Sequence, residues 1–317
     1  MAKPTSSSSS SSSESGSDSS PAAAAAAAAA PARREIPAEP YPWKRVTLGV
    51  FLVFLCWTIG LYRENKDRAD HHLRKLQHWG FNHLWSHLSP GSSERLHPLR
   101  QPLWNRVHGT VLEIGPGFGE SLALVPGGRK GTKVVSKYVV LEPNHFMHDR
   151  LATNAAAAGF SVRFDPNTCP EAVDGEQQTL LPPLVIVNGT LDSSDRIPTT
   201  VVESGPYDCV ISSMVLCSVD DPEQNLENIQ KLLKPGGLFV FVEHVRHKDV
   251  GIWRRIQDLI TPVWALFTGN CRLDRETGNI LDTMGGWASV DYRRVSQQQS
   301  GVIDKLTPII YGVATKK

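Results

Sequence analysis

The chain has 317 residues, enough for one large domain or two small ones, and its formal net charge of +1 gives no overall bias towards nucleic acid as a partner. The five cysteines are odd in number and form no CxxC pair, which disfavours a disulfide framework and a zinc site. We therefore expect no nucleic-acid partner, no metal, and reduced thiols in a domain that faces the cytosol or the mitochondrial matrix. The cysteines are Cys56, Cys169, Cys209, Cys217 and Cys271.

Residues 1–40 have the composition of a disordered tail. Ser6–Ser13 is an unbroken serine run and Ala22–Ala30 an unbroken alanine run, and prolines punctuate both. Such a segment contains too little branched or aromatic apolar material to compensate for the entropy lost on ordering. The absence of an apolar stretch after a basic start disfavours a secretory signal, and acidic residues disfavour a mitochondrial presequence.

Residues 44–62 are predicted to form a single transmembrane anchor. The stretch Val46–Tyr62 carries no charge, and basic residues flank it on both sides. It approaches the length of about 20 apolar residues that a bilayer requires, and its Trp and Tyr residues suit the interfacial region. A buried core helix is the alternative. The basic residues on the two sides are too similar in number to predict the orientation.

Residues 63–106 are predicted to form a helical linker. Leu73, Leu76, Trp79 and Leu84 recur at roughly helical spacing, which predicts an amphipathic helix near the membrane surface or against the following domain. His83 and His87 are four residues apart, as helical metal ligands can be, but no acidic residue accompanies them.

Residues 107–317 are predicted to form an α/β domain. Apolar segments typical of buried strands alternate with helical patterns, which indicates a doubly wound, mostly parallel sheet covered on both faces, with its ligand beyond the carboxyl ends of the strands. The predicted strands are 109–115, 137–144, 184–190, 207–219 and 238–245, and the predicted helices are 145–159 and 221–237.

Three glycines follow the first predicted strand, at Gly115, Gly117 and Gly119. A dinucleotide fingerprint would place a glycine at position 120, where this chain has Glu120, and a glutamate at a helix start is a poor neighbour for a pyrophosphate. S-adenosylmethionine carries a sulfonium and an ammonium and no phosphate. Glu113 can attract that positive charge, and Glu142, at the end of the second strand, can accept hydrogen bonds from two ribose hydroxyls.

This pattern resembles the class I, seven-stranded S-adenosylmethionine-dependent methyltransferases with a Rossmann-like fold, over residues 107–317. Further stretches resemble the membrane-associated methyltransferase-like proteins that methylate small alkyl thiols. These stretches are VLCSV at 215–219, LLKPGGLFVFVEHV at 232–245, the spaced set Trp253, Gln257, Pro262, Trp264, Phe267, Gly269 and Cys271, DRETG at 274–278 and YGVATKK at 311–317.

The resemblance implies a role for each matching residue. Glu113, Gly115, Gly117 and Gly119 would face the methionine part of the cofactor, and Glu142 would bind the ribose. Asn188, Gly189 and Thr190 would meet the adenine, and Ser212 to Val215 would line the sulfonium and acceptor side. The chain departs from the family in Pro116 and Phe118, in an insert at about 165–183, and in its Ser/Ala-rich tail.

Methyl transfer from a sulfonium depends mostly on positioning and desolvation, but a thiol or hydroxyl acceptor must also lose its proton. His244, Glu243 and Asp258 are the candidate bases, and His244 has the most suitable ordinary pKa. Strand alternation allows at most one of Glu243 and His244 to point into the pocket. The apolar segment 253–267 is interpreted as a lid or a membrane-facing entrance, or else as a packing helix.

We therefore expect a membrane-anchored, single-pass methyltransferase that uses S-adenosylmethionine and acts on a small lipophilic acceptor, with a thiol as one candidate. The endoplasmic reticulum and the inner mitochondrial membrane are both compatible with the sequence. Alternatives are methylation of a lipid or quinone precursor, and a non-catalytic scaffold with the same fold. Glu120 and the missing third dinucleotide glycine disfavour a nicotinamide oxidoreductase.

Overall fold

The computed structural model describes residues 66–125, 134–169, 181–192, 197–295 and 301–317. The predicted tail at 1–40 and the predicted membrane anchor at 44–62 lie outside these residues. Within the described residues, every helix is too short or too polar to cross a membrane.

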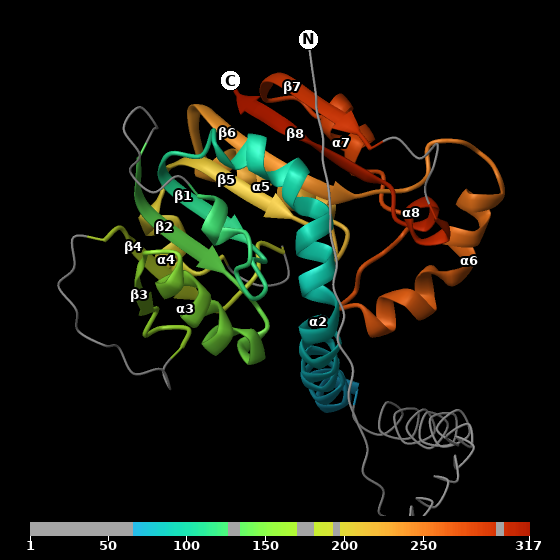
Figure 1. Ribbon diagram of the computed structural model, residues 1–317, viewed down its shortest axis with the longest axis horizontal. Coiled ribbons are helices and arrows are strands. Elements are labelled where there is room, and N and C mark those ends of the chain that lie inside the picture. The colour runs from blue at the N-terminus through green and yellow to red at the C-terminus, as the bar shows by residue number, and fades with distance from the viewer. Residues whose placement is uncertain (1–65, 126–133, 170–180, 193–196, 296–300) are drawn as a thin grey trace, which may run out of the picture. The chain divides into compact units, whose positions relative to one another are not determined.

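The described residues form one eight-stranded sheet with the order β3-β4-β2-β1-β5-β6-β8-β7 (Figure 1). β6 pairs with β8, and β8 with β7, in the antiparallel sense, whereas all other neighbours are parallel. The strands are β1 Gly109–Ile114, β2 Val135–Leu141, β3 Ser161–Phe164, β4 Pro183–Val187, β5 Tyr207–Ser213, β6 Leu233–His244, β7 Trp287–Arg294 and β8 Ile309–Lys316.

The prediction of a mostly parallel, Rossmann-like sheet is confirmed, but the prediction of seven strands is wrong. The edge of the sheet carries the additional strand β3, which pairs in parallel with β4. β3 has only four residues, none of them fully buried, and includes the exposed Arg163. A strand so short and polar produces no clear apolar run in the sequence.

Helices cover both faces of the sheet (Figure 1). Apolar residues of α2 and α3 pack with one face, and those of α4, α5 and α7 pack with the other. The helices are α2 Lys66–Trp104, α3 His148–Ala157, α4 Thr199–Ser204, α5 Pro222–Leu232, α6 Ile252–Phe267, α7 Thr277–Thr283 and α8 Val302–Leu306, with the short 3₁₀ turns η1 Leu122–Leu124 and η2 His145–Met147.

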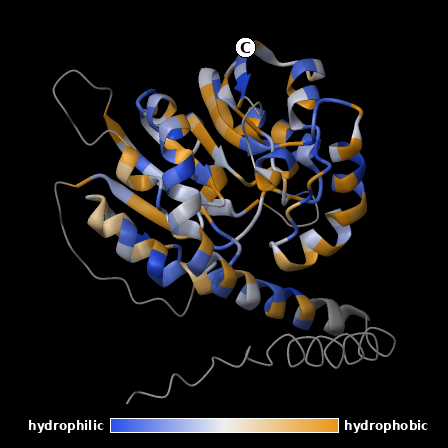
Figure 2. Ribbon diagram, turned by 45° about the vertical axis from the view of Figure 1, so that its right-hand side comes forward, coloured by the Kyte–Doolittle hydropathy of each residue, from blue (hydrophilic) through white to orange (hydrophobic). Residues whose placement is uncertain are grey.

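The two apolar cores arise from alternation along buried strands. In β1, Val111 belongs to one core and Leu112 to the other, and in β2 the same holds for Tyr138 and Val139. The strands therefore carry apolar residues on both faces, as expected for a sheet buried between two helical layers. Figure 2 shows this as hydrophobic colour along the strands at the centre of the domain.

The long helix α2 is part of the folded domain at its C-terminal end. Leu96, Leu103 and Trp104 are buried in the same core as Val111 and Tyr138. The helix continues through Pro90, Pro98 and Pro102, each of which removes a backbone donor. Tertiary packing of this end offsets the low helix propensity that the prolines impose.

Helix α5 shows how the local sequence sets an element's limits. The Asp221 side chain accepts a hydrogen bond from the backbone N–H of Gln224 at 3.0 Å, and Pro222 occupies the first turn. The helix ends at Leu232, earlier than predicted, because Lys234 to Gly237 already belong to β6.

Candidate active site

β1 lies between β2 and β5 in the sheet. From β1 the spatial order of the strands runs to β2 and β4 on one side and to β5 and β6 on the other, so the order reverses at β1. In a doubly wound sheet, the ligand binds at the carboxyl ends of the strands beside such a reversal. The glycine-rich segment that follows β1 and the segments that follow β2 and β5 therefore form the candidate site.

The three glycines after β1 all adopt left-handed backbone conformations, with φ of +54° at Gly115, +61° at Gly117 and +76° at Gly119. A Cβ atom at Gly115 would lie 2.6 Å from Cγ2 of Val215, which follows β5. Both the dihedral angle and the close approach exclude a side chain there. This segment, residues 115–119, is called the glycine loop below.

Glu142 follows β2 and binds the glycine loop directly. Its carboxyl oxygens accept hydrogen bonds from the backbone N–H groups of Gly117 and Asn144, each at 2.9 Å. Burial raises the pKa of Glu142 to about 7, and these two hydrogen bonds oppose the rise. His148, a residue that sequence reasoning missed, holds the backbone of Glu142 through a ring nitrogen 2.9 Å from its carbonyl oxygen.

The pKa of Glu142 leads to a prediction about pH. Ribose hydroxyls donate to a carboxylate better than to a carboxylic acid, so the ionised form should bind S-adenosylmethionine. With a pKa of about 7 in the free protein, we expect the dissociation constant to fall about tenfold between pH 6 and pH 8. Calorimetric titration across this range measures it. Glu142→Gln should remove most of the pH dependence, and an unchanged profile in that variant would contradict the assignment.

Glu113, near the end of β1, is buried two residues before the glycine loop begins. Its carboxyl oxygens accept hydrogen bonds from the hydroxyl of Ser121 at 2.6 Å and from the hydroxyl of Tyr138 at 2.7 Å. Burial raises its pKa, and these bonds oppose that rise. In this arrangement Glu113 fixes the start of η1 to β2. A direct contact between Glu113 and the methionine part of a cofactor stays a prediction.

The predicted adenine-binding residues follow β4. The backbone N–H of Asn188 donates to Thr168 Oγ1 at 3.1 Å. Thr190 Oγ1 is buried and has no hydrogen-bond partner among the described residues. An unpartnered buried hydroxyl is costly, and a ligand that accepts or donates there would relieve the cost. Gly189 lies between Asn188 and Thr190. The three predicted residues therefore form one continuous segment after β4, the strand that pairs with β2.

Ser212, predicted to face the sulfonium side, has its hydroxyl directed at Glu243. The hydroxyl donates to Glu243 Oε1 at 2.5 Å, and the backbone N–H groups of Val215 and Leu216 donate to the same carboxyl group at 3.3 Å and 3.0 Å. Burial raises the pKa of Glu243 to about 7. Glu243 therefore fastens the segment after β5. Its role as a base stays a prediction.

Replacing Glu243 should loosen this segment. Glu243→Ala leaves three donors without their acceptor, and we expect the free energy of unfolding to fall by about 2–3 kcal/mol. Glu243→Gln keeps the volume and one acceptor oxygen, so it should lose less than half as much. Urea denaturation of both variants measures the difference. Equal losses would mean that volume, rather than the hydrogen bonds, accounts for the effect of Glu243.

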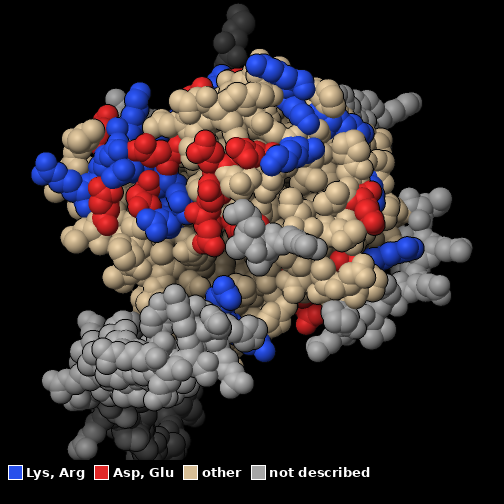
Figure 3. Space-filling view, turned by 180° about the vertical axis from the view of Figure 1, so that it is seen from behind, with Lys and Arg blue, Asp and Glu red and all other residues tan. Residues whose placement is uncertain are grey.

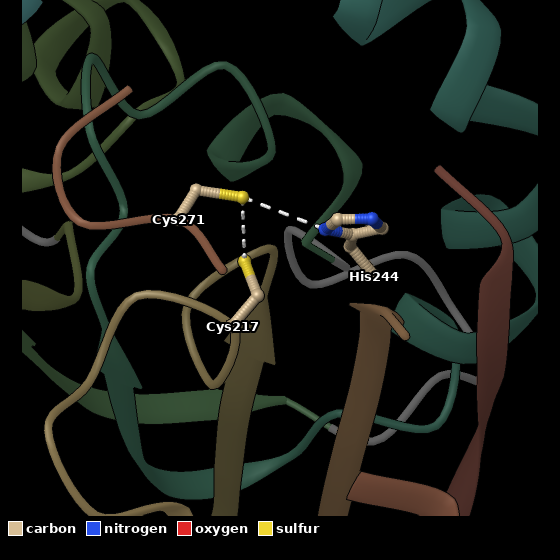
Figure 4. Close-up of side chains that lie close together, drawn as sticks. All are labelled: Cys217, His244 and Cys271. Atoms are coloured by element: carbon tan, nitrogen blue, oxygen red, sulfur yellow. Dashed lines mark hydrogen bonds between the residues drawn. The ribbon is translucent and has the colours of Figure 1, made fainter. Parts of the chain in front are cut away.

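His244 lies at the end of β6 beside two thiols (Figure 4). Its Nδ1 is 3.5 Å from Cys271 Sγ, which is 3.4 Å from Cys217 Sγ. Hydrogen bonding to Cys217 and the proximity of His244 lower the pKa of the Cys271 thiol well below its usual range. The sequence predicted a site role for His244 but treated both cysteines as packing residues. Because the carboxyl ends of parallel strands meet at one edge of the sheet, the sequence could have placed Cys217, which follows β5, beside His244, which ends β6. The position of Cys271 depends on how the chain returns after α6.

Asp258, the third candidate base, lies on α6 and forms an ion pair with Arg246. Its side chain is exposed, and its carboxylate is engaged by that guanidinium. Of the three candidates, His244 is the one for which a hydrogen-bonding contact with Cys271 is seen among the described residues, through its Nδ1.

Helix α6 presents an apolar face outward. Its fully buried residues are polar, Gln257 and Thr261, and Gln257 bridges the backbone of His247 and Leu306 with two hydrogen bonds of 2.8 Å. The exposed apolar residues of this helix are Ile252, Leu259, Val263, Leu266 and Phe267. An exposed apolar set of this size marks an interaction surface more often than an ordinary packing helix.

Charged side chains of both signs occur on the face of the domain shown in Figure 3. Ion pairs in the domain illustrate the mixing of charges, since Arg246 and Arg254 both pair with Glu276. The charges therefore partly neutralise one another.

The chain matches the profile of a protein family described as methyltransferase domain, over residues 67–277. It is 25% identical to human thiol S-methyltransferase TMT1B over 212 residues, which cover 64% of this chain and 73% of that protein. It is 34% identical to human thiol S-methyltransferase TMT1A over 117 residues, which cover 36% of this chain and 46% of that protein.

A solved structure of the N-methyltransferase NodS from Bradyrhizobium japonicum, in complex with S-adenosyl-L-homocysteine, is 16% identical to the chain. The match covers 70% of this chain and 86% of that chain, with a TM-score of 0.42. The family match, in contrast, spans the glycine loop, Glu142 and the segments after β4, β5 and β6. The chain therefore belongs to the methyltransferase domain family, and it is a class I S-adenosylmethionine-dependent methyltransferase.

Proposed function

We propose that this enzyme transfers the methyl group of S-adenosylmethionine to a small lipophilic thiol. The observation that carries the proposal is the match to two human thiol S-methyltransferases, one over 64% and the other over 36% of this chain. The position of the Cys217–His244–Cys271 cluster supports it, because this cluster lies at the edge of the sheet where the acceptor is expected.

The proposed reaction is an in-line displacement. The acceptor thiol first loses its proton, and its sulfur then forms a bond to the methyl carbon. The bond from that carbon to the sulfonium breaks with its electron pair left on sulfur, giving a methyl thioether and S-adenosylhomocysteine. The glycine loop and Glu142 hold the donor, so most of the rate enhancement comes from positioning. The group that takes up the proton of the acceptor thiol is expected to lie near His244.

The acceptor class can be tested by product analysis. The full chain is incubated with S-adenosylmethionine carrying a deuterated methyl group and with matched alkyl thiols, phenols and a lipid extract. We expect mass spectrometry to find deuterated methyl thioethers. Labelled phenol ethers or lipids without labelled thioethers would contradict the thiol assignment and favour the alternative, a lipid or quinone precursor.

We also propose that the enzyme is a single-pass membrane protein whose α6 face contacts the bilayer, in the endoplasmic reticulum or the inner mitochondrial membrane. The uncharged stretch Val46–Tyr62 supports an anchor, and the outward apolar residues of α6 support a second contact through which a lipophilic acceptor could enter.

The double substitution Leu259→Glu and Val263→Glu tests the role of α6, because both side chains are largely exposed and their replacement removes no core contact. In vesicles, we expect KM to rise several-fold for a long-chain thiol dissolved in the bilayer. KM for a short water-soluble thiol, the internal control, should not change. A parallel rise for both acceptors would show that α6 acts on folding or catalysis rather than on membrane delivery.

A further inference from the structure

Cys217, His244 and Cys271 come from three different parts of the chain and converge on one point (Figure 4). Cys217 follows β5, His244 ends β6, and Cys271 follows α6. Among the described residues, this is the group of three potential metal ligands whose donor atoms lie within 4.8 Å of one another. Two thiols and an imidazole are the donor types that zinc binds most often in proteins.

Two of the three distances between the donor atoms agree with tetrahedral zinc. Bonds of about 2.3 Å to sulfur and about 2.0–2.1 Å to nitrogen place two thiolates about 3.8 Å apart and a thiolate and an imidazole nitrogen about 3.6 Å apart. The corresponding separations here are 3.4 Å for Cys217 Sγ to Cys271 Sγ and 3.5 Å for Cys271 Sγ to His244 Nδ1. For these two pairs, shifts of a few tenths of an ångström give the tetrahedral separations, and the donor atoms of Cys217 and His244 lie within 4.8 Å of each other.

The surroundings of His244 favour Nδ1 as the ligand atom. Its other ring nitrogen, Nε2, lies 3.5 Å from the backbone carbonyl oxygen of Leu306. A protonated Nε2 directed at a carbonyl leaves the lone pair on Nδ1, and such an outer contact is common for metal-bound histidines. Gln257 donates to the same carbonyl oxygen at 2.8 Å, which holds Leu306 in place.

The cluster borders the predicted cofactor site. Cys217 lies two residues after Val215, whose side chain closes against Gly115 of the glycine loop. Glu243 binds the backbone of Val215 and Leu216 and so fixes the segment that carries Cys217. Cys217 and His244 are buried, whereas Cys271 is partly exposed as a residue.

We propose that Cys217, His244 and Cys271 bind a zinc ion with three protein ligands, and that the fourth position takes the sulfur of the acceptor thiol. The second half of this proposal rests on the proposed function, whereas the metal site itself does not. Three protein ligands with one open position are the usual arrangement of a catalytic zinc.

The site would give His244 a role different from that of a general base. An acceptor thiol that binds zinc releases its proton to solvent and becomes a zinc-bound thiolate. That thiolate attacks the methyl group of S-adenosylmethionine, the carbon–sulfonium bond breaks with its electron pair left on sulfur, and the thioether product leaves the metal. A thioether carries no charge and is a weaker ligand, so it exchanges for the next acceptor.

The metal site is tested on the full-length chain, purified and kept under a reducing agent that does not bind metals. We expect about one zinc ion per chain by elemental analysis. Replacement by Co²⁺ should produce the visible absorption of tetrahedral cobalt together with a sulfur-to-cobalt charge-transfer band in the near ultraviolet. Folded, reduced protein that binds neither metal would overturn the proposal.

Matched variants identify the ligands. Cys217→Ser and Cys271→Ser should each lose most of the charge-transfer band, whereas Cys169→Ser should keep it. Cys169 is a suitable control because its sulfur also lies near a histidine, 3.9 Å from His148 Nδ1, but it is not part of the cluster. Bands that persist in the Cys217→Ser, Cys271→Ser double variant would place the metal elsewhere. The wild-type spectrum remains decisive if a variant fails to fold.

The thiol pair offers a competing outcome, a disulfide between Cys217 and Cys271. Peptide mapping without reduction detects it. If this disulfide predominates in protein purified from cells and the reduced protein still binds no zinc or cobalt, the metal proposal is overturned.

The role of the fourth position is tested separately from the metal. Adding an alkyl thiol to the cobalt form in the presence of S-adenosylhomocysteine should intensify the charge-transfer band, and an alcohol of the same length should not. Thiol methylation by metal-free protein would overturn the proposal that the fourth zinc position takes the acceptor, and it would leave the proposed function standing. A metal-bound protein that binds no thiol and methylates none would reject the proposed function and leave a structural zinc site.

Discussion

Glu142→Ala will weaken S-adenosylmethionine binding by about 100-fold at pH 8. The carboxylate contacts the glycine loop after β1 by accepting a hydrogen bond from the backbone N–H of Gly117. Two ribose hydroxyls would each lose a charge-assisted hydrogen bond in the variant. Calorimetry on the full chain measures the effect, with the folded state checked by circular dichroism.

Two controls separate cofactor binding from a general loss of charge. Glu142→Gln keeps an acceptor oxygen and should lose less than the alanine variant. Glu223→Ala removes an exposed glutamate from the first turn of α5 and should bind as the wild type does. If Glu142→Ala binds within about threefold of the wild type, the ribose does not lie on this carboxylate.

Trp104→Ala will lower the free energy of unfolding by about 3–5 kcal/mol. Trp104 ends α2, is 0% exposed, and packs in the core that also contains Val111 and Tyr138. Truncation removes a large apolar surface and leaves a cavity between α2 and the sheet. Urea or thermal denaturation measures the loss.

The matched control is Trp79→Ala on the same helix, where the side chain is 55% exposed. We expect it to change stability by no more than about 0.5 kcal/mol. Trp104→Phe keeps most of the volume and removes an indole N–H that has no hydrogen-bond partner among the described residues, so it should lose far less than the alanine variant. Similar losses for Trp104→Ala and Trp79→Ala would mean that the end of α2 does not contribute to the core.

The sheet was predictable where strands are fully buried. β1, β2, β4, β5 and β6 each contain an apolar run that stands out against its flanking residues, and Asp221 followed by Pro222 indicates where α5 begins. β3 was missed because its four residues include the exposed Arg163 and none is fully buried. Burial of Trp104 could not be predicted, since it depends on how α2 packs over the sheet.

The cofactor side of the site was more predictable than the acceptor side. The glycine loop and Glu142 follow the neighbouring parallel strands β1 and β2, whose carboxyl ends lie at the same edge of the sheet, so the sequence predicts that they are close together. In the structure, the backbone N–H of Gly117 donates a hydrogen bond to the Glu142 carboxyl group. The bonds from Ser121 and Tyr138 to Glu113 required the fold itself. The same is true of Cys271, which reaches His244 only after the chain has passed through α6 and returned.

A crystal structure of the full chain with S-adenosylhomocysteine tests the central claim most directly. We predict that both ribose hydroxyls lie within hydrogen-bond distance of the Glu142 carboxylate and the adenine beside Asn188 to Thr190. The thioether sulfur should face the segment after β5 that leads to Cys217. A ribose away from Glu142, or a sulfur turned away from Cys217, His244 and Cys271, would contradict the account.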